Sequence, residues 1–238
     1  MYRLKRLIIV TGANKGLGKA FYDRFISEKN EDIIISISRI ISEDQQQLID
    51  KKSSKFVFIP IDLGQMQDTS GLKQLVNFQN EVKEIIYINN AGVIDPIGKV
   101  GDIAIKELVN SINVNILAPA IIINYVFELF KGKKITIVNI SSGAADHVIE
   151  GWGAYCSGKA FMKMFLNVLG EQEKDSSLIE VYNISPGLID TEMQRKIRDT
   201  NVDGFTRHNE FVLFKEEGKL QSAKEVANKI LLETNISP

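Results

Sequence analysis

The stretch RLIIVTGANKGLG, residues 6–18, joins a short apolar run to a cluster of three glycines. An apolar run of this length is typical of a strand buried on both faces, and the residues after it have the pattern of a helix. Glycines at a strand–helix turn let the backbone bend tightly and approach a pyrophosphate, while the helix N-terminus supplies unpaired N–H groups. The stretch therefore predicts a strand–turn–helix unit that binds a dinucleotide, although a glycine-rich turn without a ligand has the same pattern.

Five further runs rich in isoleucine and valine repeat the strand pattern, at residues 33–38, 55–62, 84–92, 134–142 and 179–187. Segments of helical length lie between or after them, at residues 17–28, 68–81, 103–131, 154–173 and 222–233. We expect the third of these helices to be broken near Pro119, because proline removes a helical hydrogen bond. The alternation predicts one domain over residues 1–238: an α/β fold with a doubly wound parallel sheet and helices on both faces.

The composition is that of an ordinary globular domain, with 44% hydrophobic and 25% charged residues among 238. The net charge of −1 argues against a general nucleic-acid binder. The single cysteine excludes an internal disulfide and a cysteine-only metal cluster, so we predict a cytoplasmic protein without a metal site. The apolar stretches at 7–10 and 116–130 are too short for a signal peptide and a membrane span respectively, so we expect no membrane association.

Two cations bear on which dinucleotide is bound. Ser38 and Arg39 end the second strand, where a carboxylate would bind the 2′-hydroxyl of NAD and a basic residue the 2′-phosphate of NADP. Lys15 lies inside the glycine loop and could reach the same phosphate. Taken alone, each residue fits a solvated surface charge better than a phosphate site; together, at these two places, they favour NADP(H).

Two further strand ends carry polar or small residues. Asp62 in the segment IDLG follows the third strand, where it could meet the adenine edge or cap the next turn. The segment NNAG, residues 89–92, ends the fourth strand. Its small residues would let the backbone run along a cofactor, and its asparagines could equally form a turn.

Tyr155 and Lys159, in GWGAYCSGK at residues 151–159, are spaced to share one face of a helix. A nearby ammonium favours the phenolate and lowers the tyrosine pKa, so the pair could donate a proton near neutral pH. Cys156 turns away from Tyr155 by about 100° on a helix, and we interpret it as a packing residue.

Together these motifs resemble the short-chain dehydrogenase/reductase family over essentially the whole chain. TGANKGLG is similar to its cofactor loop, NNAG to its fourth-strand signature, YCSGK to its Tyr-x-x-x-Lys element and SPGLIDTEM to its Pro-Gly element. The resemblance implies the strand order 3-2-1-4-5-6, with the family's seventh strand missing. It also implies the catalytic residues Asn115, Ser142, Tyr155 and Lys159, with Asn113 as the rival for the asparagine.

The resemblance implies a role for each of these residues. Tyr155 would donate a proton to a carbonyl oxygen that Ser142 also hydrogen-bonds, and Lys159 would lower the pKa of Tyr155 and bind the nicotinamide ribose. Asn115 would hold a water that links Lys159 to solvent. The implied cofactor-binding residues are Gly12, Asn14, Lys15, Gly16, Leu17, Gly18, Ser38, Arg39, Asp62, Leu63, Asn90, Ala91, Gly92, Tyr155, Lys159, Pro186, Gly187, Ile189 and Thr191.

Several stretches, among them ISSGAA, GWGAYCSGKA, PGLIDTEMQRKIR and FKEEGKL, are similar to the sepiapterin reductase and bacterial benzil reductase group. Its members reduce vicinal dicarbonyls, or the dicarbonyl side chain of a pterin, with NADPH. The carboxylate that anchors the pterin near the C-terminus of sepiapterin reductases has no counterpart here. We therefore favour reduction of a benzil-like α-dicarbonyl to a hydroxyketone; the alternatives are a sepiapterin reductase, an NAD-dependent alcohol dehydrogenase and a non-catalytic dinucleotide sensor.

Residues 190–220 are polar, mixed and aromatic, as expected of a substrate-binding lid. Trp152, Met193 and Phe211 are candidates, with Ser142, for a substrate pocket, although aromatic residues here could equally pack the lid. His147 lies either at the pocket mouth or on a surface loop. The resemblance also implies a homodimer formed through the helices at 103–131 and 154–173, and a small-molecule carbonyl compound as the substrate.

Overall fold

The computed structural model describes residues 5–28, 31–51, 56–200 and 203–238. Its centre is a parallel six-stranded sheet in the order β3-β2-β1-β4-β5-β6. The strands are β1 (Arg6–Thr11), β2 (Ile33–Ser38), β3 (Phe56–Pro60), β4 (Glu84–Asn89), β5 (Lys134–Ile140) and β6 (Ile179–Ile184). This confirms the predicted doubly wound sheet and its strand order, and within the described residues the sheet ends at β6.

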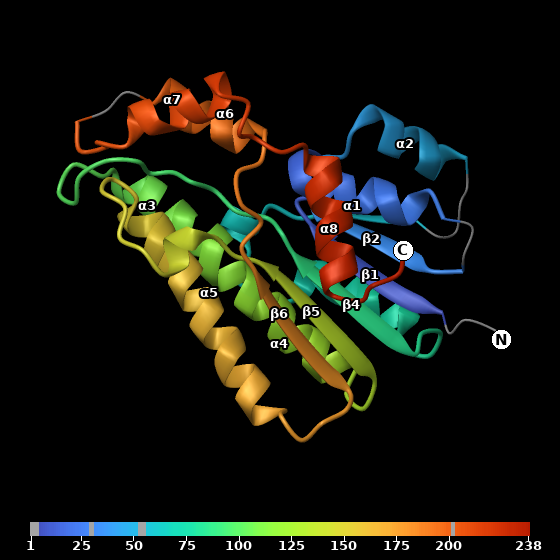
Figure 1. Ribbon diagram of the computed structural model, residues 1–238. Coiled ribbons are helices and arrows are strands. Elements are labelled where there is room, and N and C mark those ends of the chain that lie inside the picture. Colours follow the sequence, from blue (N-terminus) through green and yellow to red (C-terminus); the bar gives the residue numbers. More distant parts are fainter. Residues whose placement is uncertain (1–4, 29–30, 52–55, 201–202) are drawn as a thin grey trace.

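Helices cover both faces of the sheet (Figure 1). They are α1 (Gly16–Ile26), α2 (Glu43–Asp50), α3 (Ile105–Ile112), α4 (Ala118–Leu129), α5 (Gly153–Gln172), α6 (Glu192–Asp199), α7 (His208–Glu216) and α8 (Ala223–Glu233). Successive β1 side chains point to opposite faces, so Leu7 and Ile9 pack with α4 and α5, whereas Ile8 and Val10 pack with α1 and α8. Because both faces are covered, every residue of β1 and β2 is buried.

The long helix predicted at residues 103–131 is not broken near Pro119. It continues from Ile105 to Leu129 as α3, a π-helical segment at Asn113–Leu117, and α4. Pro119 is accommodated because it lies in the first turn of α4, directly after the wider π turn. The expected break is therefore a local widening of the helix, and it lies where Asn115 is held.

Two other elements differ from the prediction. The segment 68–81 forms a 3₁₀ helix at Ser70–Phe78 instead of an α-helix. The short polar helix α2 was not predicted; the Gln45 side chain caps its first turn by accepting from the Ser42 N–H at 3.0 Å. The Gln45 side-chain amide also donates to the Ala13 carbonyl at 2.7 Å, so a contact distant in the sequence helps to fix this helix.

The helical stretch Ile105–Leu129 has two different faces. By length and composition alone it could span a membrane, although 33% of its apolar window is buried inside the protein. Ile122, Ile123 and Val126 pack into the core, as in a core helix of a globular domain. The outer face leaves apolar side chains exposed, as does the neighbouring α5: Ile105, Leu108, Val109, Ile112, Leu117, Phe161, Met164 and Val168.

A buried ion pair connects the first two strands to the C-terminal segment. The Arg6 guanidinium contacts the Asp32 carboxylate, with side chains only 6% and 2% exposed. The same guanidinium donates to the Ser237 carbonyl at 2.7 Å. Removing one partner would leave a buried charge without compensation, so the pair holds three separate segments together.

The segment predicted to be a lid, residues 190–220, lies over one end of the sheet and contains α6 and α7 (Figure 1). Its two ends meet, because the Asp190 N–H donates to the Gln221 carbonyl at 2.9 Å and the Gln221 N–H donates to the Leu188 carbonyl at 2.9 Å. Phe205 and Phe211 of the lid pack in one cluster with Trp152 and Tyr155 of the body. The described part of the lid is thus fixed both at its ends and through an aromatic cluster.

Candidate active site

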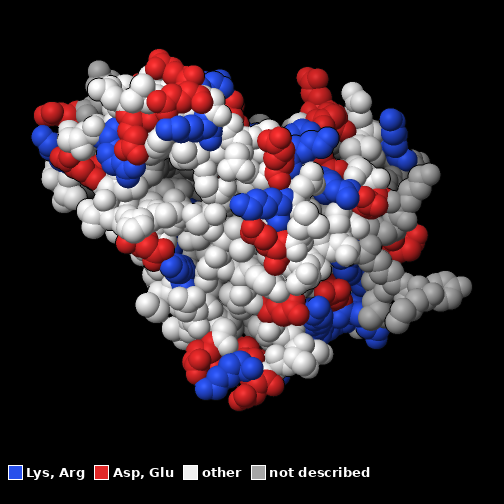
Figure 2. Space-filling model, viewed as in Figure 1, with Lys and Arg blue, Asp and Glu red and all other residues white. Residues whose placement is uncertain are grey.

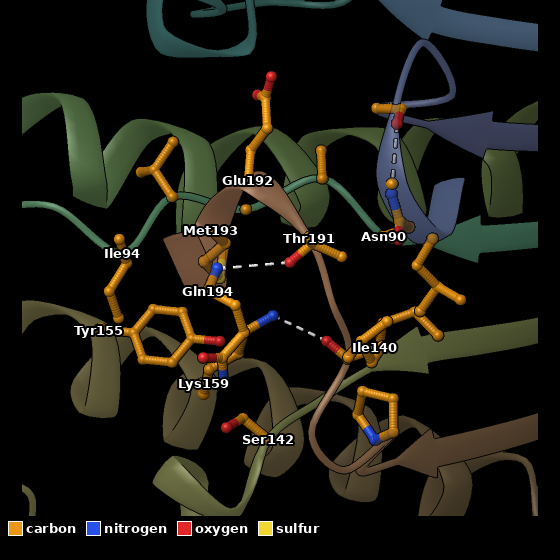
Figure 3. Close-up of a pocket in the computed structure, with 18 of the residues that line it drawn as sticks. Asn90, Ile94, Ile140, Ser142, Tyr155, Lys159, Thr191, Glu192, Met193 and Gln194 are labelled. Atoms are coloured by element: carbon orange, nitrogen blue, oxygen red, sulfur yellow. Dashed lines mark hydrogen bonds between the residues drawn. The ribbon is translucent and has the colours of Figure 1, made fainter. Parts of the chain in front are cut away.

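A cavity of about 910 Å³ lies at the carboxyl ends of the strands, between the lid and the glycine loop. Figure 2 shows the surface hollowed below the lobe that carries α6 and α7. Figure 3 shows residues entering this cavity from two sides, with Thr191, Met193 and Gln194 on one side and Ser142, Tyr155 and Lys159 on the other. This is the edge where ligands bind in doubly wound sheets.

Three of the four predicted catalytic side chains line the cavity. Ser142 lies two residues after the end of β5, and Tyr155 and Lys159 lie one turn apart on α5. The Ser142 hydroxyl lies close enough to the Tyr155 phenol to lower its pKa. The Lys159 ammonium donates to the Ile140 carbonyl at 2.7 Å and lies 5.7 Å from the centre of the Tyr155 ring. A hydroxyl pair and a buried ammonium therefore converge on one point.

Asn115 lies behind this group, in the π-helical segment. Its Oδ1 accepts from the Val93 N–H at 2.9 Å and its Nδ2 donates to the Val93 carbonyl at 2.8 Å. Gly92 and Gly158 leave room for it, since a Cβ on Gly158 would lie 3.0 Å from the Asn115 Cβ. The rival Asn113 points elsewhere, because its amide donates to the Gly64 carbonyl at 2.8 Å. The structure thus places Asn115, and not Asn113, behind the lysine.

Burial dominates the pKa values of the catalytic pair. It raises the pKa of Tyr155 to about 12, and the nearby Ser142 hydroxyl offsets part of this rise. Burial lowers the pKa of Lys159 to about 8, because the ammonium loses its hydration. The expected lowering of the tyrosine pKa by Lys159 is not seen in this structure, where burial is the larger effect. Tyr155 stays protonated at neutral pH, which is the form that can donate a proton.

The glycine loop has the backbone that a dinucleotide requires. Gly12 and Gly16 have positive φ angles of 66° and 56°. A Cβ on Gly18 would lie 2.3 Å from the Gly12 carbonyl oxygen, so only glycine lets α1 start this close to β1. The first turn of α1 carries no acidic residue, which leaves its positive dipole end available to an anion.

Thr11, which sequence analysis did not single out, joins the glycine loop to the end of β4. Its Oγ1 accepts from the Asn90 and Ala91 N–H groups, both at 3.1 Å. The Asn90 side-chain amide donates back to the Thr11 carbonyl at 2.9 Å. The sequence signal for this contact was a threonine directly before the first glycine of the loop. Its role depends on the end of β4, about 80 residues later in the chain.

The residues predicted to select NADP lie along the same cavity. Ser38 is buried and donates to the Ile40 carbonyl at 2.7 Å, while Arg39 is exposed. Lys15 forms an ion pair with Glu192 at the start of α6. Asp62 caps its own turn by accepting from the Gly64 N–H at 2.9 Å, and it also lines the cavity, so the two interpretations of this residue are compatible.

The segment after β6 completes the cofactor wall. Pro186, Gly187, Ile189 and Thr191 all line the cavity. Ile189 forms a parallel bridge with Gln221 whose two hydrogen bonds use the backbone of the residues on either side of it. The N–H and C=O of Ile189 take no part in these two bonds and point away from Gln221. They are therefore suited to hydrogen-bond the amide group of a ligand. Thr191 caps α6 through the Gln194 N–H at 3.4 Å.

The substrate end of the cavity is aromatic and apolar. The Trp152 ring packs edge-on against Tyr155 at 5.6 Å between centroids and contacts Phe211 at 5.2 Å. Met193 lines the same wall, as predicted. His147 lies at the mouth, exposed to solvent and lining the cavity, and Cys156 packs against the aromatic cluster. Sequence analysis missed further lining residues, which depend on how the lid folds back: Ile94, Ile149, Gln194, Ile197, Arg207 and Phe214.

No group of three or more histidine, cysteine, aspartate or glutamate side chains in the described ranges could hold a metal ion. The residues that are present instead fit a dinucleotide. Glycines with positive φ angles, an unopposed helix N-terminus and the backbone of Ile189 line one continuous wall that leads to Tyr155 and Ser142.

Comparison with known proteins gives the same result. A sequence model of the family described as short chain dehydrogenase matches residues 6–202. A benzil reductase ((S)-benzoin forming) of Bacillus cereus is 33% identical over 241 residues, covering 98% of this chain and 96% of the relative. A sepiapterin reductase of Bos taurus is 29% identical, covering 95% of this chain and 88% of the relative.

The solved structures agree with the fold. The crystal structure of a short-chain dehydrogenase/reductase from Saccharomyces cerevisiae superposes with a TM-score of 0.76 at 25% identity, covering 92% of this chain and 86% of that one. This chain belongs to the short-chain dehydrogenase/reductase family, whose members are oxidoreductases that act on carbonyl or alcohol groups with a nicotinamide dinucleotide.

Proposed function

We propose that this protein is an NADPH-dependent carbonyl reductase that reduces a benzil-like α-dicarbonyl compound to a hydroxyketone. The observation that carries the proposal is the pairing of the Tyr155 and Ser142 hydroxyl groups at the base of an aromatic chamber. A flat, apolar, aryl-substituted ketone matches that chamber in shape and polarity. The 33% identity to a benzil reductase over nearly the whole chain supports the same substrate class.

The side chains divide the reaction between them. NADPH, when bound, supplies the hydride that is added to the carbonyl carbon. Ser142 Oγ donates a hydrogen bond to the carbonyl oxygen and so polarises it. Tyr155 gives the phenolic proton to the same oxygen, which completes the alcohol. Lys159 keeps positive charge beside the phenol as this proton leaves, and is itself oriented by the Ile140 carbonyl.

The preference for NADPH rests on two cations at the adenosine end. Lys15 and Arg39 both line the cavity beside the end of β2, where a 2′-phosphate would lie. The Ser38 side chain contributes no negative charge there. A phosphate with a charge of about −1.5 to −2 between two cations gains charge-assisted hydrogen bonds that NADH cannot make.

A pterin substrate is less well matched. The carboxylates that line the cavity are Asp62 and Glu192. Asp62 caps a turn after β3, and Glu192 pairs with Lys15 at the cofactor loop. Neither lies in the aromatic chamber, where the guanidine-like edge of a pterin would need an acidic partner.

We further propose that the protein forms a homodimer in the cytoplasm. The exposed apolar side chains of α3 and α5, such as Val109, Ile112 and Met164, give these helices a surface suited to a second copy. Size-exclusion chromatography with light scattering on the wild type and on Met164→Lys tests this proposal. A monomeric wild type would contradict it.

The deciding experiment is the oxidation of NADPH by the purified protein with benzil, and in parallel with sepiapterin. Turnover of benzil alone is the expected result. Turnover of sepiapterin alone would replace the proposal with the pterin alternative. Binding of NADPH without turnover of any carbonyl compound in a broad panel would support a dinucleotide sensor instead.

A further inference from the structure

Gln194 is a buried polar side chain that the reaction described above does not use. It lies in the first turn of α6 and is only 8% exposed. Its Oε1 has no hydrogen-bond partner among the described residues, although it is buried. Figure 3 shows Gln194 in the pocket that holds Tyr155, Lys159 and Ser142, and it lines the cavity with them.

A purely structural role does not explain an amide at this position. The backbone N–H of Gln194 already caps α6 through Thr191, and this bond does not need the side chain. Its neighbour one turn later, Ile197, is buried in the aromatic cluster. A buried amide without a partner costs about 1–3 kcal/mol, which leucine or methionine would avoid. An amide that finds no partner for its oxygen among the described residues is a candidate to bind a group from outside the protein.

Two other residues that line the cavity carry a buried polar atom without a partner among the described residues: Ser141, next to Ser142, and Trp152. Ile94, Trp152 and Phe211 are apolar or aromatic. Arg207 is held by Glu210 through two bonds of 2.6 Å, and His147 is exposed at the mouth. Trp152 Nε1 is also buried without a partner among the described residues, but its ring is fixed by stacking with Phe205 at 5.7 Å.

We propose that the Gln194 amide binds the second oxygen of the substrate, on the carbon next to the one that is reduced. Tyr155 and Ser142 together occupy the first oxygen, so the second needs a separate partner in an otherwise apolar chamber. An amide suits both ends of the reaction, because its NH₂ donates to a ketone and its Oε1 accepts from a hydroxyl. The inference rests on the proposed function and extends it, since Gln194 would select vicinal dioxygenated substrates over simple ketones.

Two substrates that differ only at the second oxygen test this inference. Benzil has two adjacent carbonyl groups, and deoxybenzoin has the same two phenyl rings with a methylene in place of one carbonyl. Gln194→Met keeps the length of the side chain and its helix propensity but removes both hydrogen-bonding groups. We expect kcat/KM for benzil to fall roughly 10- to 100-fold in this variant, the range of one lost hydrogen bond in a buried site, while deoxybenzoin changes less than about twofold.

Two controls separate this effect from damage to the lid. Arg195→Met, on the same helix but exposed and outside the cavity, should leave the ratio of the two substrates unchanged. The affinity for NADPH, followed by fluorescence titration, should be the same in wild type and Gln194→Met. The affinity of the enzyme–NADP⁺ complex for benzoin, measured by calorimetry, should fall in Gln194→Met, which gives a result independent of turnover.

The possible outcomes separate a failure of the proposed function from a failure of the role assigned to Gln194. Wild-type turnover of benzil tests the proposed function, and its absence would overturn both that function and the role of Gln194. With benzil turnover present, an equal loss for both substrates would show that Gln194 only shapes α6. An unchanged benzil rate would likewise overturn the assignment.

Discussion

Lys159 lies one helical turn after Tyr155 on α5, and its ammonium donates to the Ile140 carbonyl at 2.7 Å, 5.7 Å from the centre of the tyrosine ring. The ammonium is thus held by the end of β5, the strand that also leads to Ser142. The proposed acid Tyr155, the proposed polarising hydroxyl of Ser142 and the buried ammonium of Lys159 are thus positioned by two elements, β5 and α5. Their geometry depends on how this strand and this helix pack together.

Loss of the Tyr155 hydroxyl should stop the reaction without affecting cofactor binding. We expect Tyr155→Phe to lower kcat by roughly 10²- to 10⁴-fold, the usual contribution of a positioned general acid. The Kd for NADPH should stay within about twofold, since one hydroxyl among many contacts is removed. Tyr182→Phe, on β6, is a matched control and should retain activity. Near-normal turnover by Tyr155→Phe would exclude this residue as the proton donor.

The Lys159 ammonium should give activity and stability opposite responses to pH. Its pKa of about 8 means that its charge is lost as pH rises through that value, so the reduction rate should fall above about pH 8. Tyr155, with a pKa of about 12, remains protonated over this range. A rate that stays constant from pH 7 to pH 10 would show that the charge of Lys159 is not needed.

Folding stability responds to pH in the opposite direction to activity. Between about pH 8 and the ordinary lysine pKa of 10.5, the unfolded chain binds more protons than the folded one, so the contribution of Lys159 to folding improves as pH rises. We expect Lys159→Met to melt at a higher temperature than wild type at pH 7, and this difference to shrink by pH 10. Thermal unfolding at both pH values measures it, and a difference that grows with pH would contradict the buried-ammonium description.

Arg39 and Lys15 should set the preference for NADPH. Arg39→Ala is expected to weaken NADPH binding roughly tenfold, the effect of one hydrogen bond to a charged group, and to leave NADH binding unchanged. Arg24→Ala, on α1 and outside the cavity, is the control for general loss of charge. If Arg39→Ala and wild type bind NADPH with equal affinity, Arg39 does not contact the 2′-phosphate.

Glu192 competes for Lys15 in the same region. The lysine holds the pKa of the Glu192 carboxyl below its usual range, and both side chains are exposed. We expect Glu192→Gln to raise NADPH affinity by roughly two- to fivefold, the scale of an exposed ion pair, and more at low salt. Titrations at two ionic strengths measure this. A weaker affinity in Glu192→Gln would show that the carboxylate supports the cofactor site.

The buried Arg6–Asp32 pair should be necessary for folding. Asp32→Ala leaves the guanidinium buried without its anion, and we expect a loss of about 3–5 kcal/mol in the free energy of unfolding. The double variant Arg6→Met, Asp32→Leu should recover most of this loss, because it removes both charges. Urea unfolding of both variants tests the coupling. A double variant less stable than Asp32→Ala would mean that the Ser237 contact of Arg6 is the more important one.

The structural features that could be predicted from the sequence are those that depend on the local pattern of residues. The unbroken apolar runs gave the parallel sheet, because strands covered on both faces need no polar residues. The spacing of Tyr155 and Lys159 placed them on one helix face. The short helix α2 and the widened turn at Asn115 escaped prediction, since they depend on Gln45 reaching Ala13 and on the packing around Gly158.

The candidate site was predictable only in part for the same reason. The glycine loop and the strand ends lie next to each other in any such sheet, so Gly12 and Asn90 could be placed in advance. Gln194 could not, because the lid must fold back before α6 meets the chamber. The pKa of Tyr155 also depends on burial, which no spacing of residues reveals.

The lid has one further property that follows from the bridge between Ile189 and Gln221. Because its two ends leave and rejoin the body at a single point, the excursion is an insert whose length and sequence can change without moving the strands on either side. Ile189, Thr191 and Glu192 all line the cavity, so cofactor recognition reaches a few residues into the insert. A lid from another reductase of this fold, transplanted after Glu192 and rejoining the chain at Gln221, is expected to exchange the preferred substrate and leave the hydride chemistry in place.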